Sequence, residues 1–366
     1  MVRHLAGREI HRPDFPLLTM AGPATPSEIV KGLLQGIAPP RPLFLPIVFS
    51  HAARLENLSL RSFLSNPTKI SNSLRLIRGR LRADGIICYF DPFLEAQTLG
   101  ATIEWSADGQ SPSLRWPDGI AKGEWPEVPA SSGARVKNSP VALAIDVVRR
   151  LKAIVRDDCL LTASVTGPFT LAALLMGNDP AVLSATAVPA EALDVAAATI
   201  SEIAKALAEA GVGAIFIRED FLPALSPEDF EAWTSRLAPT MNIVRFYQAL
   251  PVLLLGGTGA FAANRDAIAS HPWDCVVCPL LDEIMAGNAA LAPSSNPYSE
   301  LASARLGLAL PAGAFDVGQS GAAEFDERVR RIVSELRPAI ITTAGDVPAA
   351  ADVEHLNKLW EDVRRA

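Results

Sequence analysis

Short apolar runs that end in polar residues recur along the chain and alternate with segments of helical periodicity. The runs are apolar throughout rather than alternating, which is typical of parallel strands that are buried on both faces. We therefore predict eight strands, at Leu43–Phe49, Gly85–Phe90, Cys159–Val165, Val212–Ile217, Pro251–Leu255, Asp274–Leu281, Leu306–Leu310 and Ala339–Thr343.

The segments between most of these strands carry apolar residues every three to four positions, which predicts amphipathic helices. The clearest are Leu58–Leu81, with a break near Asn66-Pro67, and then Ser139–Val155 and Ala190–Ala210. Eight alternating β and α units are the pattern of a (β/α)8 TIM barrel. A doubly wound α/β sheet is the alternative, but the lack of a dominant glycine-rich fingerprint favours the barrel.

Two segments fall outside this repeat. Residues 1–40 are rich in Pro and Gly and contain one helical piece, Pro26–Gln35, so we predict an N-terminal extension. The segment from about residue 103 to 134 is predicted to be an insertion that covers one rim of the barrel. Alternating residues around Asp108-Gly109 indicate a small hairpin within it. The barrel itself is predicted over residues 41–366.

Composition narrows the class of protein. The chain has 366 residues, 49% of them hydrophobic, and a formal net charge of −7, which argues against a nucleic-acid or anionic-membrane surface. No secretory signal is visible in Met1–Ile10, and no run reaches the ~18 apolar residues of a membrane span. Four cysteines are too few for a disulfide scaffold. We expect a cytoplasmic enzyme with a small-molecule substrate, and the sequence is compatible with a homodimer.

Polar residues at strand ends are the candidates for chemistry, because barrel active sites lie at the C-terminal ends of the strands. Asp91 follows the second predicted strand, and Glu95 lies four residues further on. His51 is the only histidine at a predicted strand end, so it is a candidate acid, base or ligand, with a purely structural histidine as the alternative. We predict Asp91, His51 and Glu95 as catalytic.

Other strand ends offer groups that suit an anionic substrate. Arg218 could bind a carboxylate in a bidentate contact, although Arg218-Glu219-Asp220 could equally be an internal ion pair. The glycine-rich turn at residues 256–259 could hold an anion on backbone N–H groups, and a tight turn explains it equally well. The predicted substrate-binding residues are Arg54, Arg218, Glu219, Gly257, Thr258 and Asp346.

A weak metal motif lies near the sixth strand. His271, Cys275 and Cys278 have the spacing H-x3-C-x2-C, which is compatible with zinc. Residues three apart in a strand lie on opposite faces, so both cysteines would need a local bend to share an ion. We therefore favour two small buried hydrophobes, with His271 at the end of the preceding helix, and predict no metal site.

Several stretches, in order, carry a family resemblance: Tyr89–Asp91 with Gln97–Gly100, then Thr166–Leu171, then Ile341–Pro348 with Val353–Leu356. Together they resemble the uroporphyrinogen decarboxylase superfamily, which contains the decarboxylase and the zinc-dependent methyltransferases that serve corrinoid proteins. The resemblance runs from about residue 40 to the end and implies a TIM barrel.

For the decarboxylase branch, the resemblance implies that Asp91 holds pyrrole N–H groups and stabilises positive charge as CO2 leaves. That branch also needs an arginine-rich first loop to bind the carboxylates of a tetrapyrrole. The corresponding residues, Phe49–Leu55, offer only His51 and Arg54. A highly carboxylated porphyrinogen would therefore be poorly bound.

For the methyltransferase branch, the resemblance implies a His-x-Cys zinc motif after the fifth strand. Leu253–Gly257 offers no such ligand, although Glu95 matches an acid of that branch. Our first hypothesis is one-carbon transfer between a small methylated substrate and a corrinoid or tetrahydrofolate carrier, with a corrinoid protein as partner and zinc only weakly supported. The alternatives are decarboxylation of a tetrapyrrole or other carboxylated substrate, and a non-catalytic barrel that binds a ligand or partner.

Overall fold

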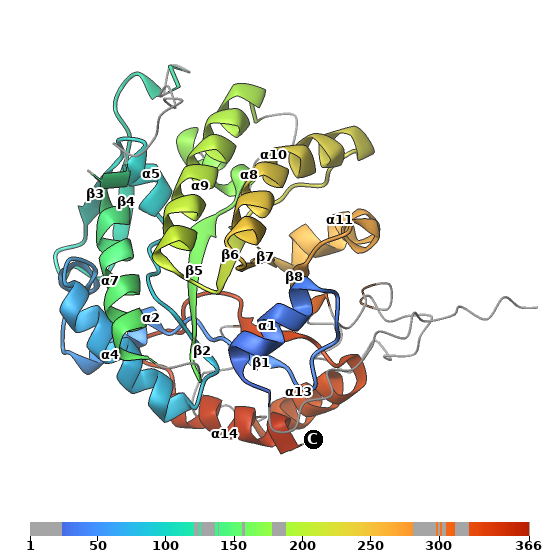
Figure 1. The fold of residues 1–366 in the computed structure, drawn as a ribbon. Helices are drawn as coiled ribbons and strands as arrows, with labels where there is room; N and C mark the ends of the chain where they lie inside the picture. The colour runs from blue at the N-terminus through green and yellow to red at the C-terminus, as the bar shows by residue number, and fades with distance from the viewer. Residues whose placement is uncertain are drawn as a thin grey trace, which may run out of the picture.

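Eight parallel strands form one sheet in the order β1-β10-β9-β8-β7-β6-β5-β2, with helices around it (Figure 1). The computed structural model describes residues 24–120, 124–125, 136–137, 139–155, 158–177, 188–280, 298, 301, 305–311 and 322–365. The sheet curls into a nearly closed barrel, which confirms the predicted (β/α)8 fold. Its strands are β1 Leu43–Phe44, β2 Gly85–Ile87, β5 Leu160–Thr166, β6 Ala214–Glu219, β7 Leu250–Leu255, β8 Cys275–Pro279, β9 Leu306–Leu310 and β10 Ile340–Thr343.

The helices enclose the barrel because each buries one apolar stripe against the strands. Several helices begin and end at capping residues. Ser139 and Ser226 accept backbone N–H bonds at the starts of α7 and α10, and Gly211 ends α9 at a φ of 102°. The helices are α1 Pro26–Leu34, α2 Phe49–Leu55, α3 Leu60–Leu64, α4 Pro67–Leu81, α5 Leu94–Thr98, α7 Pro140–Ile154, α8 Pro168–Leu175, α9 Ala190–Ala210, α10 Pro227–Phe246, α11 Thr258–Ser270, α13 Ala322–Leu336 and α14 Val353–Arg365.

Asp84 connects the two ends of the sheet, β1 and β2. Its amide donates to the Phe44 carbonyl at 3.0 Å, and its carboxylate accepts the Phe44 amide at 2.9 Å. Arg41 also donates two hydrogen bonds of 2.9 Å to this carboxylate. One residue, through its main chain and its side chain, thus takes the place of the missing ladder between β1 and β2.

Alternate residues of each strand enter two different cores. In β6, Ala214 and Phe216 belong to the cluster that fills the lumen, whereas Ile215 and Ile217 pack against the helices. The lumen cluster also includes the buried face of α1, which crosses the N-terminal end of the barrel in front of β1 (Figure 1). The helix expected within the N-terminal extension is therefore present, and it plugs the barrel.

The first strand is shorter than the predicted Leu43–Phe49. Regular pairing with β10 ends early, since the Ile47 amide donates to the Thr343 hydroxyl at 3.1 Å and Phe49 already begins helix α2. His51 consequently lies within a helix and not at a strand end, which corrects the sequence-based expectation. The other seven predicted strands match the observed ones to within a few residues.

The predicted hairpin is present at the edge of the molecule. Strands β3, Thr102–Trp105, and β4, Pro112–Arg115, pair in antiparallel register around the turn at Asp108-Gly109. The indole N–H of Trp116 donates to the Leu174 carbonyl of α8 at 2.7 Å and fastens the insertion to the barrel. Among the helices that the structure describes, none is long and apolar enough to cross a membrane.

Candidate functional site

Arg218 lies at the centre of the candidate site. It follows Ala214 and Phe216 at even spacing along β6, so it shares their face and enters the lumen at its C-terminal end. The residue is only 5% exposed, and its guanidinium carbon lies 4.5 Å from the centre of the Phe90 ring. A cation is thus held over an aromatic face inside a nearly dry barrel mouth.

The guanidinium is only partly satisfied. One of its terminal nitrogens, Nη2, forms an ion pair with Asp220, whose side chain is 39% exposed. Its Nε is buried and has no hydrogen-bond partner among the residues that the structure describes. A buried donor without a partner is costly, so this N–H marks a place for a ligand acceptor.

Glu95 lies close enough to Arg218 to feel its charge. Its carboxylate is buried and accepts two hydrogen bonds from Thr166, at 3.0 Å from the amide and 2.8 Å from the hydroxyl. Burial raises the pKa of Glu95 from 4.5 to about 7, although the Thr166 bonds and Arg218 favour the ionised form. Glu95 is therefore able to hold or release a proton near neutral pH.

Asp346 approaches the same arginine from the end of β10. Its carboxylate accepts the amides of Phe49 and Ser50 at 2.7 and 2.8 Å, which fixes the start of α2. Burial raises the pKa of Asp346 to about 6, against the opposing effect of these bonds and of Arg218. The structure thus brings together three predicted site residues, namely Arg218, Glu95 and Asp346.

Asp91 directly follows Phe90 in the chain. Its carboxylate accepts the Phe93 amide at 2.9 Å and the Gln97 side-chain amide at 2.8 Å. Burial raises the pKa of Asp91, while these two hydrogen bonds oppose the change. Both bonds are local, so Asp91 shapes the turn into α5, and its carboxyl group is largely desolvated.

His51 and Arg54 are separated from this group. Both lie on α2 and contact the loop after β10, where Arg54 donates to the Ala349 carbonyl at 2.7 Å. Burial lowers the pKa of His51, and the nearby charge of Arg54 adds to the effect. Within the described part of the chain, the charged groups that influence the pKa of His51 are Arg54, Arg80 and Asp352, and not Arg218 or Glu95.

Glu219 points away from the lumen. Its fully buried carboxylate accepts hydrogen bonds from the Phe169 and Thr170 amides at 3.1 and 2.9 Å, and from the Thr170 hydroxyl at 2.9 Å and the Trp233 indole at 3.0 Å. Burial raises its pKa to about 7. Three of these bonds anchor the start of α8 and the fourth comes from α10, so the structure gives Glu219 a supporting position in place of the expected contact with substrate.

The glycine-rich turn after β7 is explained in part by a close neighbour. A Cβ on Gly256 would lie 2.5 Å from Oδ1 of Asp220. Gly257 precedes α11 and has more space, since the nearest atom to its Cβ would be the Asp220 carbonyl oxygen at 3.7 Å. Thr258 is the first residue of α11. Anion binding by this turn stays a prediction.

The cysteines of the weak metal motif lie on opposite faces of β8. Cys275 belongs to the lumen core and Cys278 to the outer core. His271 follows the last residue of α11 and packs against Trp273, with ring centres 4.2 Å apart and ring planes tilted by 47°. Within the described part of the chain, no group of three or more His, Cys, Asp or Glu side chains is arranged to hold a metal ion. These residues do not fit a shared zinc ion.

Sequence reasoning missed Ser164, which lies one layer below Arg218. Leu160 belongs to the lumen core, so Thr162, Ser164 and Thr166 share its face of β5. The Ser164 hydroxyl is buried and has no partner among the described residues. Polar residues at every second position of an otherwise apolar strand were the available signal. Two further acids, Asp282 after the predicted strand Asp274–Leu281 and Asp316 after Leu306–Leu310, are also candidates by sequence and lie outside the described residues.

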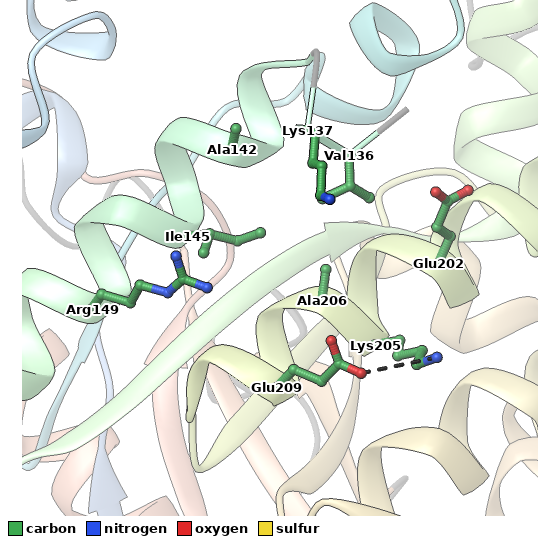
Figure 2. Close-up of a pocket in the computed structure, with 9 residues that line it drawn as sticks. All are labelled: Val136, Lys137, Ala142, Ile145, Arg149, Glu202, Lys205, Ala206 and Glu209. Atoms are coloured by element: carbon green, nitrogen blue, oxygen red, sulfur yellow. Dashed lines mark ion pairs between the residues drawn. The ribbon is translucent and has the colours of Figure 1, made fainter. Parts of the chain in front are cut away.

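A separate cavity of about 340 Å3 lies outside the barrel, between α7 and α9 (Figure 2). Ile145 and Ala206 form its apolar floor, and charged side chains surround them. Two of these, Lys205 and Glu209, pair with each other at 3.9 Å. This groove is lined by helix surfaces and contains none of the strand-end residues.

The architecture of the chain recurs in a known structure. A methyltransferase from Methanosarcina mazei superposes with a TM-score of 0.69 at 14% identity, over 93% of this chain and 98% of that chain. A putative vitamin-B12-independent methionine synthase from Listeria monocytogenes gives 0.47 at 13% identity, over 88% and 95%. A homocysteine methyltransferase from Escherichia coli gives 0.46 at 14% identity, over 91% and 99%. At 14% identity the likeness to the Methanosarcina mazei methyltransferase shows the fold alone.

No curated protein matches the sequence. The sequence model of uroporphyrinogen decarboxylase (URO-D) matches residues 25–277, which is more than half of the chain. The match begins at the cap of α1, in keeping with the position of this helix in the barrel core. With eight parallel strands, a carboxyl group after the second strand and this match, the chain belongs to the uroporphyrinogen decarboxylase family.

Proposed function

We propose that this chain transfers a one-carbon group between a small methylated substrate and a corrinoid or tetrahydrofolate carrier, in the C-terminal mouth of the barrel. The single observation that carries the proposal is Arg218, a buried guanidinium with an unpartnered Nε, placed near carboxyl groups that titrate close to neutral pH. The likeness in fold to the Methanosarcina mazei methyltransferase supports it.

The proposed chemistry needs an anchor and an acid. The methyl group leaves a heteroatom of the substrate for a nucleophile of the carrier, and the bonding electron pair stays on the heteroatom. A proton from the neutral form of Glu95, whose pKa is about 7, would neutralise that leaving group. Arg218 would hold a carboxylate of the substrate, and Asp91 would orient its reacting end. No step is routed through zinc, because the residues do not fit it.

The test is methyl transfer between cob(I)alamin or tetrahydrofolate and a panel of small methylated acids, followed by absorbance and mass spectrometry. We expect Asp91→Ala and Glu95→Gln to lower kcat by about 100-fold or more, in the range typical of general acid–base groups. Glu231→Gln is the matched control, because Glu231 is exposed on α10. Full turnover by Asp91→Ala would show that the active site lies elsewhere.

Decarboxylation is the second candidate, favoured by Asp91 and by the family match. A tetrapyrrole substrate would need several cationic anchors, but Arg54 is already bound to the Ala349 carbonyl. We therefore favour a smaller carboxylated substrate for this alternative. Absence of uroporphyrinogen binding at micromolar concentration excludes the tetrapyrrole, and ligand binding without any turnover would point to a non-catalytic barrel.

A further inference from the structure

Two buried polar groups in the upper lumen lack partners among the described residues: the Nε of Arg218 and the hydroxyl of Ser164. Arg218 is 5% exposed and Ser164 is 8% exposed. In the β5–β6 register, Ser164 lies opposite Phe216 and Thr166 lies opposite Arg218. Ser164 and Arg218 are therefore diagonal neighbours on the lumen face, a separation that a long side chain can bridge.

A carboxylate is the ligand group that would satisfy both donors at once. It accepts a charge-assisted bond from a guanidinium N–H and a second bond from a hydroxyl. The Phe90 ring under the guanidinium limits the tilt of the guanidinium plane. The other nearby carboxylates have donors of their own, since Thr166 binds Glu95, and Phe49 and Ser50 bind Asp346.

Asp220 differs from those two acids. Its side chain is 39% exposed, whereas that of Arg218 is 6% exposed, so the acid lies on the solvent side of the pair. Within the described part of the chain, its carboxylate receives a side-chain hydrogen bond from Arg218 alone. Gly256 allows this close approach, because a Cβ there would meet Asp220 at 2.5 Å.

We propose that Arg218 and Ser164 form a subsite for the carboxylate of a small organic acid, and that Asp220 occupies the guanidinium until the ligand displaces it. The subsite rests on the proposed function in one respect: it requires that the methylated substrate carry an acidic group. Asp220 acts as an internal competitor, which makes the site selective for ligands whose carboxylate reaches both Arg218 and Ser164.

The experiment is an NMR titration of the full chain with propionate and with propionamide, its uncharged counterpart. We expect Asp220→Asn to bind propionate about tenfold more tightly than the unmodified chain, because the competing charge is removed. Ser164→Ala should bind it about three- to tenfold more weakly. Arg218→Lys should also weaken binding by about tenfold, because the ammonium lacks the planar fork. Propionamide affinity should be the same in all four proteins.

Equal propionate affinity in Asp220→Asn and the unmodified chain would overturn the proposal, as would equal binding of propionamide and propionate. Thermal unfolding of each variant identifies any loss of propionate affinity that comes from misfolding. The expected result for Asp220→Asn is a gain of affinity, which misfolding does not explain. The titration needs no turnover. If the affinities are as expected but the chain transfers no methyl group, the subsite is supported and the proposed function is contradicted.

Discussion

Burial decides what each charged side chain in the barrel mouth can do. Arg218 and Glu219 are adjacent in sequence, yet one enters the lumen and the other anchors a helix, because successive strand residues face opposite sides. Glu95 and Asp346 are ordinary acids in sequence, and desolvation raises the pKa of each toward neutrality. The chemical character of these residues therefore comes from their surroundings.

Glu95 gives a prediction at this scale. Its pKa is raised from 4.5 to about 7 in the folded chain, so between these values folding takes up a proton and stability falls as pH rises. Gln stays neutral throughout. We therefore compare the free energy of unfolding of Glu95→Gln with that of the unmodified chain. This difference should shift in favour of the variant by on the order of 2–3 kcal/mol between pH 5 and pH 8.

Urea denaturation at the two pH values measures this difference. The exposed Glu231→Gln serves as the control and should follow the pH dependence of the unmodified chain. A difference for Glu95→Gln that stays constant from pH 5 to pH 8 would mean that Glu95 ionises normally in the folded state.

At the scale of elements, contacts from distant segments determine where helices begin. Gly167 precedes α8 and offers no side-chain cap. Three hydrogen bonds from Phe169 and Thr170 to the Glu219 carboxylate, at the end of the neighbouring strand β6, take the place of such a cap. A Cβ on Gly167 would lie 2.3 Å from the carboxyl carbon of Glu219, which explains the glycine. Asp346 does the same for α2 from the end of β10.

We predict that Glu219→Ala lowers the free energy of unfolding by about 3 kcal/mol or more, because four buried donors lose their acceptor. Glu219→Gln should cost about 1–2 kcal/mol, since its amide nitrogen no longer accepts. Chemical denaturation gives both values, and Glu231→Ala on α10 is the control. A loss below about 1 kcal/mol for Glu219→Ala would argue that α8 is held by its apolar contacts alone.

At the scale of the whole molecule, the N-terminal helix belongs to the barrel. Helix α1 begins with a capping box between Thr25 and Glu28. Its residues Ile29, Val30 and Leu33 are buried in the same cluster as the lumen side chains of the strands. The barrel would otherwise open its apolar interior to water at this end, so α1 completes the core.

The burial of α1 against the lumen residues leads to a stability prediction. Ile29→Ala should lower the free energy of unfolding by about 2–4 kcal/mol, the range for a fully buried aliphatic side chain that leaves a cavity. Lys31 lies on the exposed face of the same helix, so Lys31→Ala should change the free energy of unfolding by less than about 0.5 kcal/mol. Similar values for the two variants in urea unfolding would show that α1 contributes little to the core.

The sequence by itself determined the fold and the region of the site. Apolar runs such as Leu306–Leu310 are visible locally, and eight of them with intervening helices admit few other architectures. The carboxyl groups that follow strands, such as Asp91, were located for the same reason. Even the separation of Cys275 and Cys278 onto opposite faces follows from the two-residue period of a strand.

Only the tertiary structure decided which of these residues meet. Arg218, Glu95 and Asp346 come from segments more than a hundred residues apart, and their proximity depends on barrel closure. His51 was expected at a strand end, but the early end of β1 places it in α2. Ser164 became a candidate once the strand register placed it in the lumen below Arg218. Local patterns encode elements, whereas burial and the partners of a polar group are properties of the packed whole.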